Sequence, residues 1–168
     1  MDIPASNSAG RFDEILRLIG ELNYTWTNTE SLLVHLIAGL AAVDKETATV
    51  IFLTLGASRA RISLVERLAK LDRVESERRD AVLSAMRALL KGQKVRNHYN
   101  HCLYAFDSDN QPAMTINLRI SESRDSIRLD GSRRLDARTL EEFYASLEQI
   151  KSTNQQIWGI IRKYEFPT

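Results

Sequence analysis

The residues with the clearest chemical potential form one run, Arg96-Asn97-His98-Tyr99-Asn100-His101. The run lies where a helical apolar stripe should continue, because apolar residues upstream recur at intervals of four and three. The same spacing then reaches polar side chains in mid-helix. Burying an unpaired arginine or amide costs roughly several kcal/mol, so the segment must face a paired network, a subunit interface or a solvated cleft. The apolar residues are Val82, Met86 and Leu89, and the polar ones that follow are Gln93, Arg96 and Asn100.

These residue types suit phosphodiester chemistry. On a helix, Asn97 and His101 share one face, and Arg96 and Asn100 form a second pair beside them. A histidine that titrates near neutrality moves a proton, an arginine fork holds phosphate oxygens, and an amide orients a hydroxyl or an imidazole. Cleavage of RNA through its own 2′-hydroxyl needs both a base and an acid. A two-fold dimer that brings two copies of the run together would supply both.

Basic residues gather in the same region. No acidic residue lies between Asp80 and Asp107, and anions should therefore prefer this stretch. The formal net charge of +1 excludes a simple polyelectrolyte binder. We predict Arg96, Asn97 and His101 as catalytic residues. The predicted substrate-binding residues are Lys91, Lys94, His98 and Asn100.

Arg96, the polar Asn97 after it, three further residues and then His101, late in a helix, resemble the Arg-x4-His motif of the HEPN (higher eukaryotes and prokaryotes nucleotide-binding) superfamily. The resemblance implies an all-α domain that dimerises along the motif-bearing helices. It further implies, as in active members, a metal-independent ribonuclease. In that case Arg96 would stabilise the phosphorane, His101 would be the general acid or base, and Asn97 would fill the polar position after the arginine.

The resemblance also implies partners and a setting. The expected partners are a second copy of the chain, RNA or a nucleotide, and a cognate antitoxin or nucleotidyltransferase of a toxin or defence system. The chain departs from the family after the histidine. Cys102 stands where many members have a small residue such as glycine, and Leu103 stands where the members modified by a nucleotidyltransferase have tyrosine, so we predict no adenylylation there.

A second hypothesis needs no catalysis. The chain would then be a helical dimerisation or adaptor module, with an Arg96 network that only specifies the interface. We predict no metal and no cofactor, because His98 and His101 lack nearby carboxylate ligands and the sequence has no Gly-rich phosphate loop.

The elements that would position these residues follow from hydrophobic periodicity. Strict alternation in Met114, Ile116, Leu118 and Ile120, and again in Ile127 and Leu129, predicts a β-hairpin over residues 113–130. Spacing of three and four residues predicts helices elsewhere. The arginines of the third helix are interpreted as a solvated face, with contact to a phosphate-bearing partner as the alternative. The five predicted helices span residues 11–42, 45–55, 58–71, 76–104 and 137–164.

The expected fold is all-α: a single domain over residues 1–168, built as an antiparallel bundle of about five helices with a small β-hairpin before the last helix. Its 168 residues, 43% of them apolar, suffice for one good core. Cys102 is the only cysteine, which excludes an internal disulfide and fits a reducing compartment. We expect a cytoplasmic protein without a membrane anchor, because the apolar runs are too short to span a bilayer.

Overall fold

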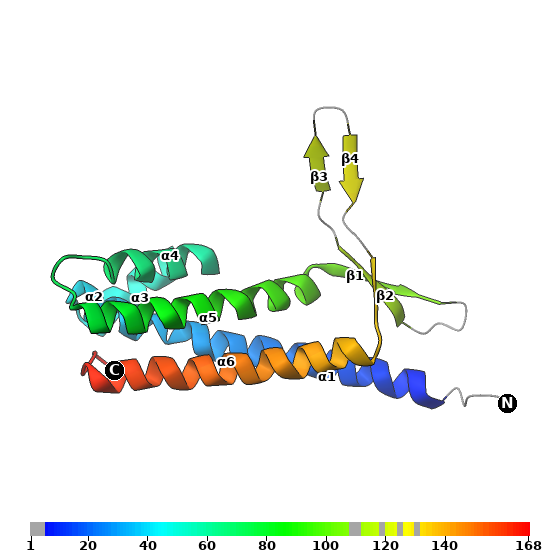
Figure 1. The fold of residues 1–168 in the computed structure, drawn as a ribbon, viewed down its shortest axis with the longest axis horizontal. Coiled ribbons are helices and arrows are strands. Elements are labelled where there is room, and N and C mark those ends of the chain that lie inside the picture. Colours follow the sequence, from blue (N-terminus) through cyan, green and yellow to red (C-terminus); the bar gives the residue numbers. More distant parts are fainter. Residues whose placement is uncertain (1–5, 108–111, 118–119, 124–125, 130–131) are drawn as a thin grey trace. The chain divides into compact units, whose positions relative to one another are not determined.

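The computed structural model describes residues 6–107, 112–117, 120–123, 126–129 and 132–168. These residues form helices with a small β-insertion before the last helix (Figure 1), which confirms the predicted fold class. None of the described helices is long and apolar enough to cross a bilayer. In chain order the elements are α1 (Ser6–Ser31), α2 (Leu33–Ala41), α3 (Lys45–Thr54), α4 (Ser58–Leu68), α5 (Ser76–Asn100), β1 (Cys102–Phe106), β2 (Pro112–Asn117), β3 (Ile120–Ser123), β4 (Ser126–Leu129), β5 (Ser132–Arg134) and α6 (Ala137–Lys163).

Contacts divide the chain into two compact units. The mixed unit, with helical and strand segments, comprises Met1–Asn23 and Lys94–Ser146. The helical unit comprises Tyr24–Gln93 and Leu147–Thr168. Helices α1, α5 and α6 each contribute residues to both units.

In the helical unit, three long helices approach one another at a glycine of α5. A Cβ on Gly92 would lie 2.8 Å from Cγ1 of Ile150 on α6 and 3.7 Å from Cζ3 of Trp26 on α1. Trp26 is buried, and its indole nitrogen donates to Glu30 at 3.1 Å. Helix α2 packs against both α3 and α4. A glycine on α5 thus provides the space that the Trp26 ring and Ile150 fill.

The predicted helix over residues 11–42 is divided into α1 and α2 at Leu32. Two side chains before the break bond to the helix backbone: Thr29 Oγ1 donates to the Thr25 carbonyl, and Ser31 Oγ donates to the Asn28 carbonyl, each at 2.8 Å. Such bonds compete with the helical ladder, and the Leu32 amide donates at 3.2 Å to the carbonyl only three residues back, Thr29. The apolar register survives, because Leu33 continues the buried seam.

The β-insertion is larger than the predicted single hairpin. Strands β1, β2 and β5 form an antiparallel sheet in the order β1-β2-β5, and β3 and β4 form a separate hairpin. In that hairpin Ile120 pairs with Leu129. The Leu118 side chain lies outside the described residues. The prediction missed β1, because Leu103 and Tyr104 extend the helical spacing in sequence but pair instead with Ile116 and Thr115 of β2.

The C-terminal tail folds back onto α2 in the helical unit. Glu165 adopts a left-handed φ of 51°, and the Phe166 amide donates to the Ile161 carbonyl at 3.0 Å. These features direct the buried Phe166 ring onto Gly39 of α2. Nδ1 of His35 lies 2.7 Å from the carbonyl oxygen of Pro167. A residue with no side chain at position 39 is therefore needed to seat the tail.

Replacing Gly39 with alanine is expected to lower the free energy of unfolding by about 1–3 kcal/mol. The new Cβ would lie 2.1 Å from Cδ1 of Phe166, so the ring must move away from α2. Chemical denaturation monitored by circular dichroism measures the change. Gly159→Ala on α6 is the matched control, since nothing lies within 4 Å of its Cβ and alanine favours helix. Equal stability of the Gly39 variant and the parent would contradict this account of the tail.

Candidate functional site

The candidate site in the mixed unit is centred on Arg96 of α5, whose guanidinium is held by two neutral amides. Nε of Arg96 donates to Oδ1 of Asn23 on α1 at 3.2 Å. Nη1 of Arg96 donates to Oδ1 of Asn97, the next residue, at 3.0 Å. Arg96 and both asparagines are half-buried. The two acceptors lie at different nitrogens of one planar group, and therefore they restrict its orientation as well as its position.

A reciprocal amide pair joins α1 to α5 beside the guanidinium. Asn23 Nδ2 donates to Asn100 Oδ1 at 2.9 Å, and Asn100 Nδ2 donates to Asn23 Oδ1 at 2.6 Å. Asn23 Nδ2 also donates to the Ile19 carbonyl at 3.0 Å. Oδ1 of Asn23 thus accepts from both Asn100 and Arg96. The sequence analysis missed Asn23, because its partners lie more than seventy residues away and no local pattern marks it.

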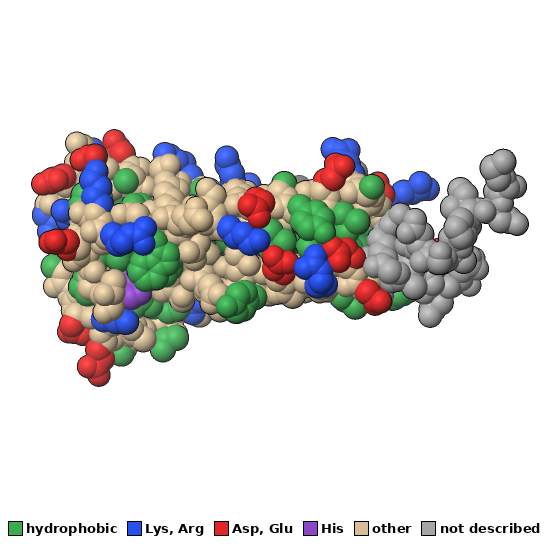
Figure 2. All heavy atoms as spheres, turned by 90° about the horizontal axis from the view of Figure 1, so that it is seen from below, with side chains coloured by type: hydrophobic (Ala, Val, Ile, Leu, Met, Phe, Trp, Pro, Cys, Tyr) green, Lys and Arg blue, Asp and Glu red, His purple; other side chains and the backbone are tan. Residues whose placement is uncertain are grey.

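Arg96 has no carboxylate within ion-pair distance in the described part of the chain, which distinguishes it from Arg17 and Arg133 of the same unit. Arg17 pairs with Glu14 at 2.8 Å, and Arg133 pairs with Glu142 at 3.0 Å. Amides orient a guanidinium without neutralising it, so the charge on Arg96 remains available to an anion. On the face drawn in Figure 2, by contrast, basic and acidic side chains are interspersed among the described residues.

The structure places His101 differently from the prediction. Helix α5 ends at Asn100 rather than near Tyr104, and His101 lies between the helix and β1. The argument that Asn97 and His101 share one helical face is therefore wrong. The His101 side chain is exposed, and within the described residues no hydrogen bond joins it to the Arg96 network. The structure thus brings together Arg96, Asn97 and Asn100 but leaves His101 at the margin of their network.

The remaining predicted residues are distributed over α5. Half-buried His98 contacts the Tyr99 ring edge-on, with 4.7 Å between ring centroids. Lys94 is exposed in the mixed unit, and Lys91 is exposed in the helical unit. Lys91 lines an open pocket of about 520 Å³ whose other residues are Ser84, Arg87, Ala88 and Gln149.

Tyr99 anchors the end of α5 in the mixed unit. Its buried ring packs on Phe143 of α6 with 4.1 Å between centroids, and its hydroxyl donates to Glu142 at 2.9 Å. Burial, together with the bond to Glu142, raises the pKa of Tyr99 well above its ordinary value. The hydroxyl therefore stays protonated and acts as a donor. This anchor holds the helix end that carries Arg96 and Asn97.

Cys102, the first residue of β1, is held as a thiol. Its Sγ donates to the Tyr99 carbonyl at 3.6 Å, and burial raises the pKa of the thiol above its usual value. A raised pKa disfavours the reactive thiolate. Across the described residues, no three His, Cys, Asp or Glu side chains gather as a possible metal site. The chemistry of this region therefore rests on the Arg96 network and on His101.

No family model, curated protein or solved structure matches this chain.

Replacing Asn23 with alanine is expected to lower the free energy of unfolding by about 1–3 kcal/mol. The change leaves half-buried groups of Arg96 and Asn100 without their acceptor. Urea denaturation measures the loss. Asn28→Ala on the same helix is the control, because its side chain is exposed. If both variants are as stable as the parent, the amide network contributes no stability.

Proposed function

We propose that this protein is a HEPN-like homodimeric domain that binds RNA and cleaves it without a metal ion. The observation that carries the proposal is the half-buried Arg96 guanidinium, oriented by Asn23 and Asn97 with no carboxylate in the described residues to neutralise it. A charge held in place by neutral dipoles needs no reorganisation when a phosphate arrives. Structural arginines, in contrast, usually have a carboxylate partner.

The remaining donors of Arg96 fit a phosphate. Nη2 makes no hydrogen bond to any described residue, so its two N–H groups, together with one on Nη1, are available to an anion. A guanidinium edge binds phosphate oxygens through parallel bonds and offsets the charge that builds up in the transition state. Arg96 would thus stabilise the phosphorane, and Asn97 would orient the Arg96 guanidinium.

His101 is assigned to proton transfer. Its exposed imidazole directly follows the helix that carries Arg96, and an imidazole can take up or release a proton. In a two-fold dimer along α5, one His101 takes the proton of the ribose 2′-hydroxyl as O2′ attacks phosphorus. The other His101 protonates the leaving 5′-oxygen as the P–O5′ bond breaks. The products are a 2′,3′-cyclic phosphate and a 5′-hydroxyl end.

The nuclease prediction is that purified protein cleaves single-stranded RNA in the presence of a chelator and leaves cyclic phosphate ends. Arg96→Ala and His101→Ala should each lower the rate by roughly a hundredfold or more, the usual scale for losing a charge clamp or a proton donor. Electrophoresis of end-labelled RNA measures both the rate and the product ends.

The matched control is Arg138→Ala, which removes an exposed arginine from the same unit. It should cut RNA at the parental rate. A melting curve of each variant separates loss of chemistry from loss of fold. If the Arg96 and His101 variants both retain parental activity, the cleavage does not come from this site.

Dimerisation is a separate expectation. The proposed reaction needs two copies of His101, one as base and one as acid, and a two-fold dimer supplies them. Sedimentation at micromolar concentration should give about twice the chain mass of 19.1 kDa. A strictly monomeric species would remove the composite base and acid.

The reciprocal amide pair supports a second candidate, the non-catalytic dimerisation or adaptor module. The side chains of Asn23 and Asn100 hydrogen-bond to each other and connect α1 to α5. This structural role needs no substrate. In this case Arg96→Ala lowers the melting temperature while the parent never cleaves RNA. The same two measurements therefore decide between the candidates.

A further inference from the structure

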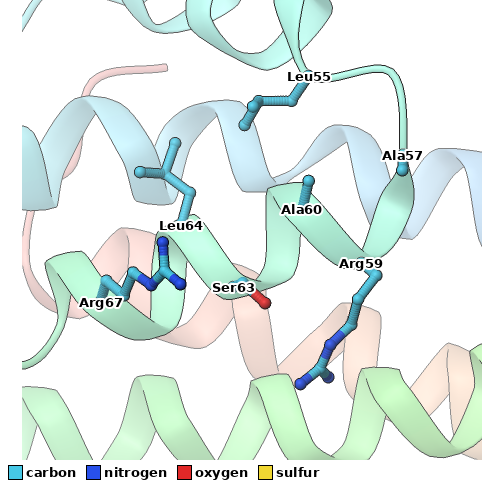
Figure 3. Close-up of a pocket in the computed structure, with 7 residues that line it drawn as sticks. All are labelled: Leu55, Ala57, Arg59, Ala60, Ser63, Leu64 and Arg67. Carbon is cyan, nitrogen blue, oxygen red and sulfur yellow. The ribbon is translucent and has the colours of Figure 1, made fainter.

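Helix α4 borders an open groove in the helical unit that the proposed nuclease does not use. We call it the α4 groove; its volume is about 530 Å³, and it is lined by Leu55, Ala57, Arg59, Ala60, Ser63, Leu64 and Arg67. Figure 3 shows the side chains of Leu55, Ala60 and Leu64 directed into the space between the end of α3 and α4. The floor of the groove is therefore apolar.

Arg59 and Arg67 also line the groove, and in Figure 3 the Arg59 side chain extends from α4 on the side opposite to Ala60 and Leu64. Arg59 and Arg67 are exposed, and neither lies within ion-pair distance of a carboxylate in the described part of the chain. Arg61 on the same helix behaves differently. Its guanidinium pairs with the buried Glu30 at 3.3 Å and stacks on Phe52, with 4.1 Å from Cζ to the ring centroid. Arg61 thus has an internal role, whereas the charges of Arg59 and Arg67 are uncompensated.

The spacing along α4 defines the shape of a complementary ligand. Arg59 and Arg67 are two helical turns apart, about 12 Å along the axis at roughly 1.5 Å per residue. Ala60 and Leu64 lie between them in sequence, one turn from each other. A ligand that matches this surface carries two carboxylates about two turns apart, with an apolar ridge between them. An acidic amphipathic helix has that pattern.

We propose that the α4 groove is a docking site for an acidic amphipathic helix of a partner protein. Charge complementarity favours this occupant: two carboxylates complement the two arginines, and aliphatic side chains complement the apolar floor. RNA fits less well, because the lining has no aromatic ring on which a base could stack.

A second copy of the chain is the strongest competing occupant. Helix α3 exposes Val50 and Leu53, residues that are 61% and 67% exposed, in line with Glu46. This ridge supplies aliphatic groups but only one carboxylate for two arginines. A partner helix with two acidic residues satisfies both.

The test is a fluorescence anisotropy titration with a synthetic, lactam-stabilised helical peptide. The peptide carries two glutamates at the spacing of the two arginines, with leucines and alanines on the same face between them. We expect it to bind the full chain with a Kd on the order of micromolar. Arg59→Glu combined with Arg67→Glu should weaken binding roughly tenfold or more and should favour a matched peptide with lysines in place of the glutamates.

The control variant combines Lys70→Glu with Arg79→Glu, an equal change of charge at residues that do not line the groove. It should bind the acidic peptide as the parent does, and circular dichroism should show that both variants are folded. The proposal is overturned if the acidic peptide does not bind, if the lysine peptide binds the parent equally well, or if the control loses as much affinity. Displacement of the peptide by single-stranded RNA would reassign the groove to nucleic acid. A fall in sedimenting mass of the peptide-free Arg59/Arg67 variant would reassign it to a second copy.

Discussion

One amide side chain controls the polar contact on which the candidate site depends. Asn23 accepts from Asn100 and Arg96 through one oxygen and donates from its nitrogen to Asn100 and the Ile19 carbonyl. Half-buried amides and guanidinium groups are stable only when they are paired. Each therefore depends on the others being present. The orientation of Arg96 is accordingly a property of the contact between α1 and α5 in the mixed unit, and not of α5 alone.

The role of each arginine is decided by the group that it faces. Arg61 faces a buried carboxylate, two backbone carbonyls and an aromatic ring, and it serves to hold α4 to neighbouring segments. Arg133 and Tyr99 share Glu142, which stabilises the end of α5. Arg96 faces amides, and Arg59 and Arg67 face solvent. Arg96, Arg59 and Arg67 have no carboxylate within ion-pair distance among the described residues, and both proposals rest on this difference from Arg61 and Arg133.

The candidate site lies where the chain changes from helix to strand. Helix α5 ends at Asn100, and β1 begins at Cys102. Its last turn is held by Tyr99 through ring packing on Phe143 and a charged hydrogen bond to Glu142. His101, between the two elements, is exposed beside this anchored turn. The exposed His101 side chain thus directly follows a helix turn that is anchored by the buried Tyr99 ring.

The presence and order of the long helical segments were predictable from the sequence, because their signals are local, although the break at Leu32 and the end of α5 at Asn100 were not. Periodic apolar residues marked the buried faces, and two caps acted within four residues: Asp44 accepts from the Thr47 amide at 2.7 Å, and Asp136 accepts from the Thr139 amide at 3.1 Å. Residues Cys102–Phe106 form a strand because they pair with β2, and this pairing outweighs the helical spacing that continues in the sequence. The contact between Asn23 and Arg96 is likewise visible only in the tertiary structure. Strand pairing and the amide network both join residues distant in sequence, and a local pattern carries no information about which distant groups will meet.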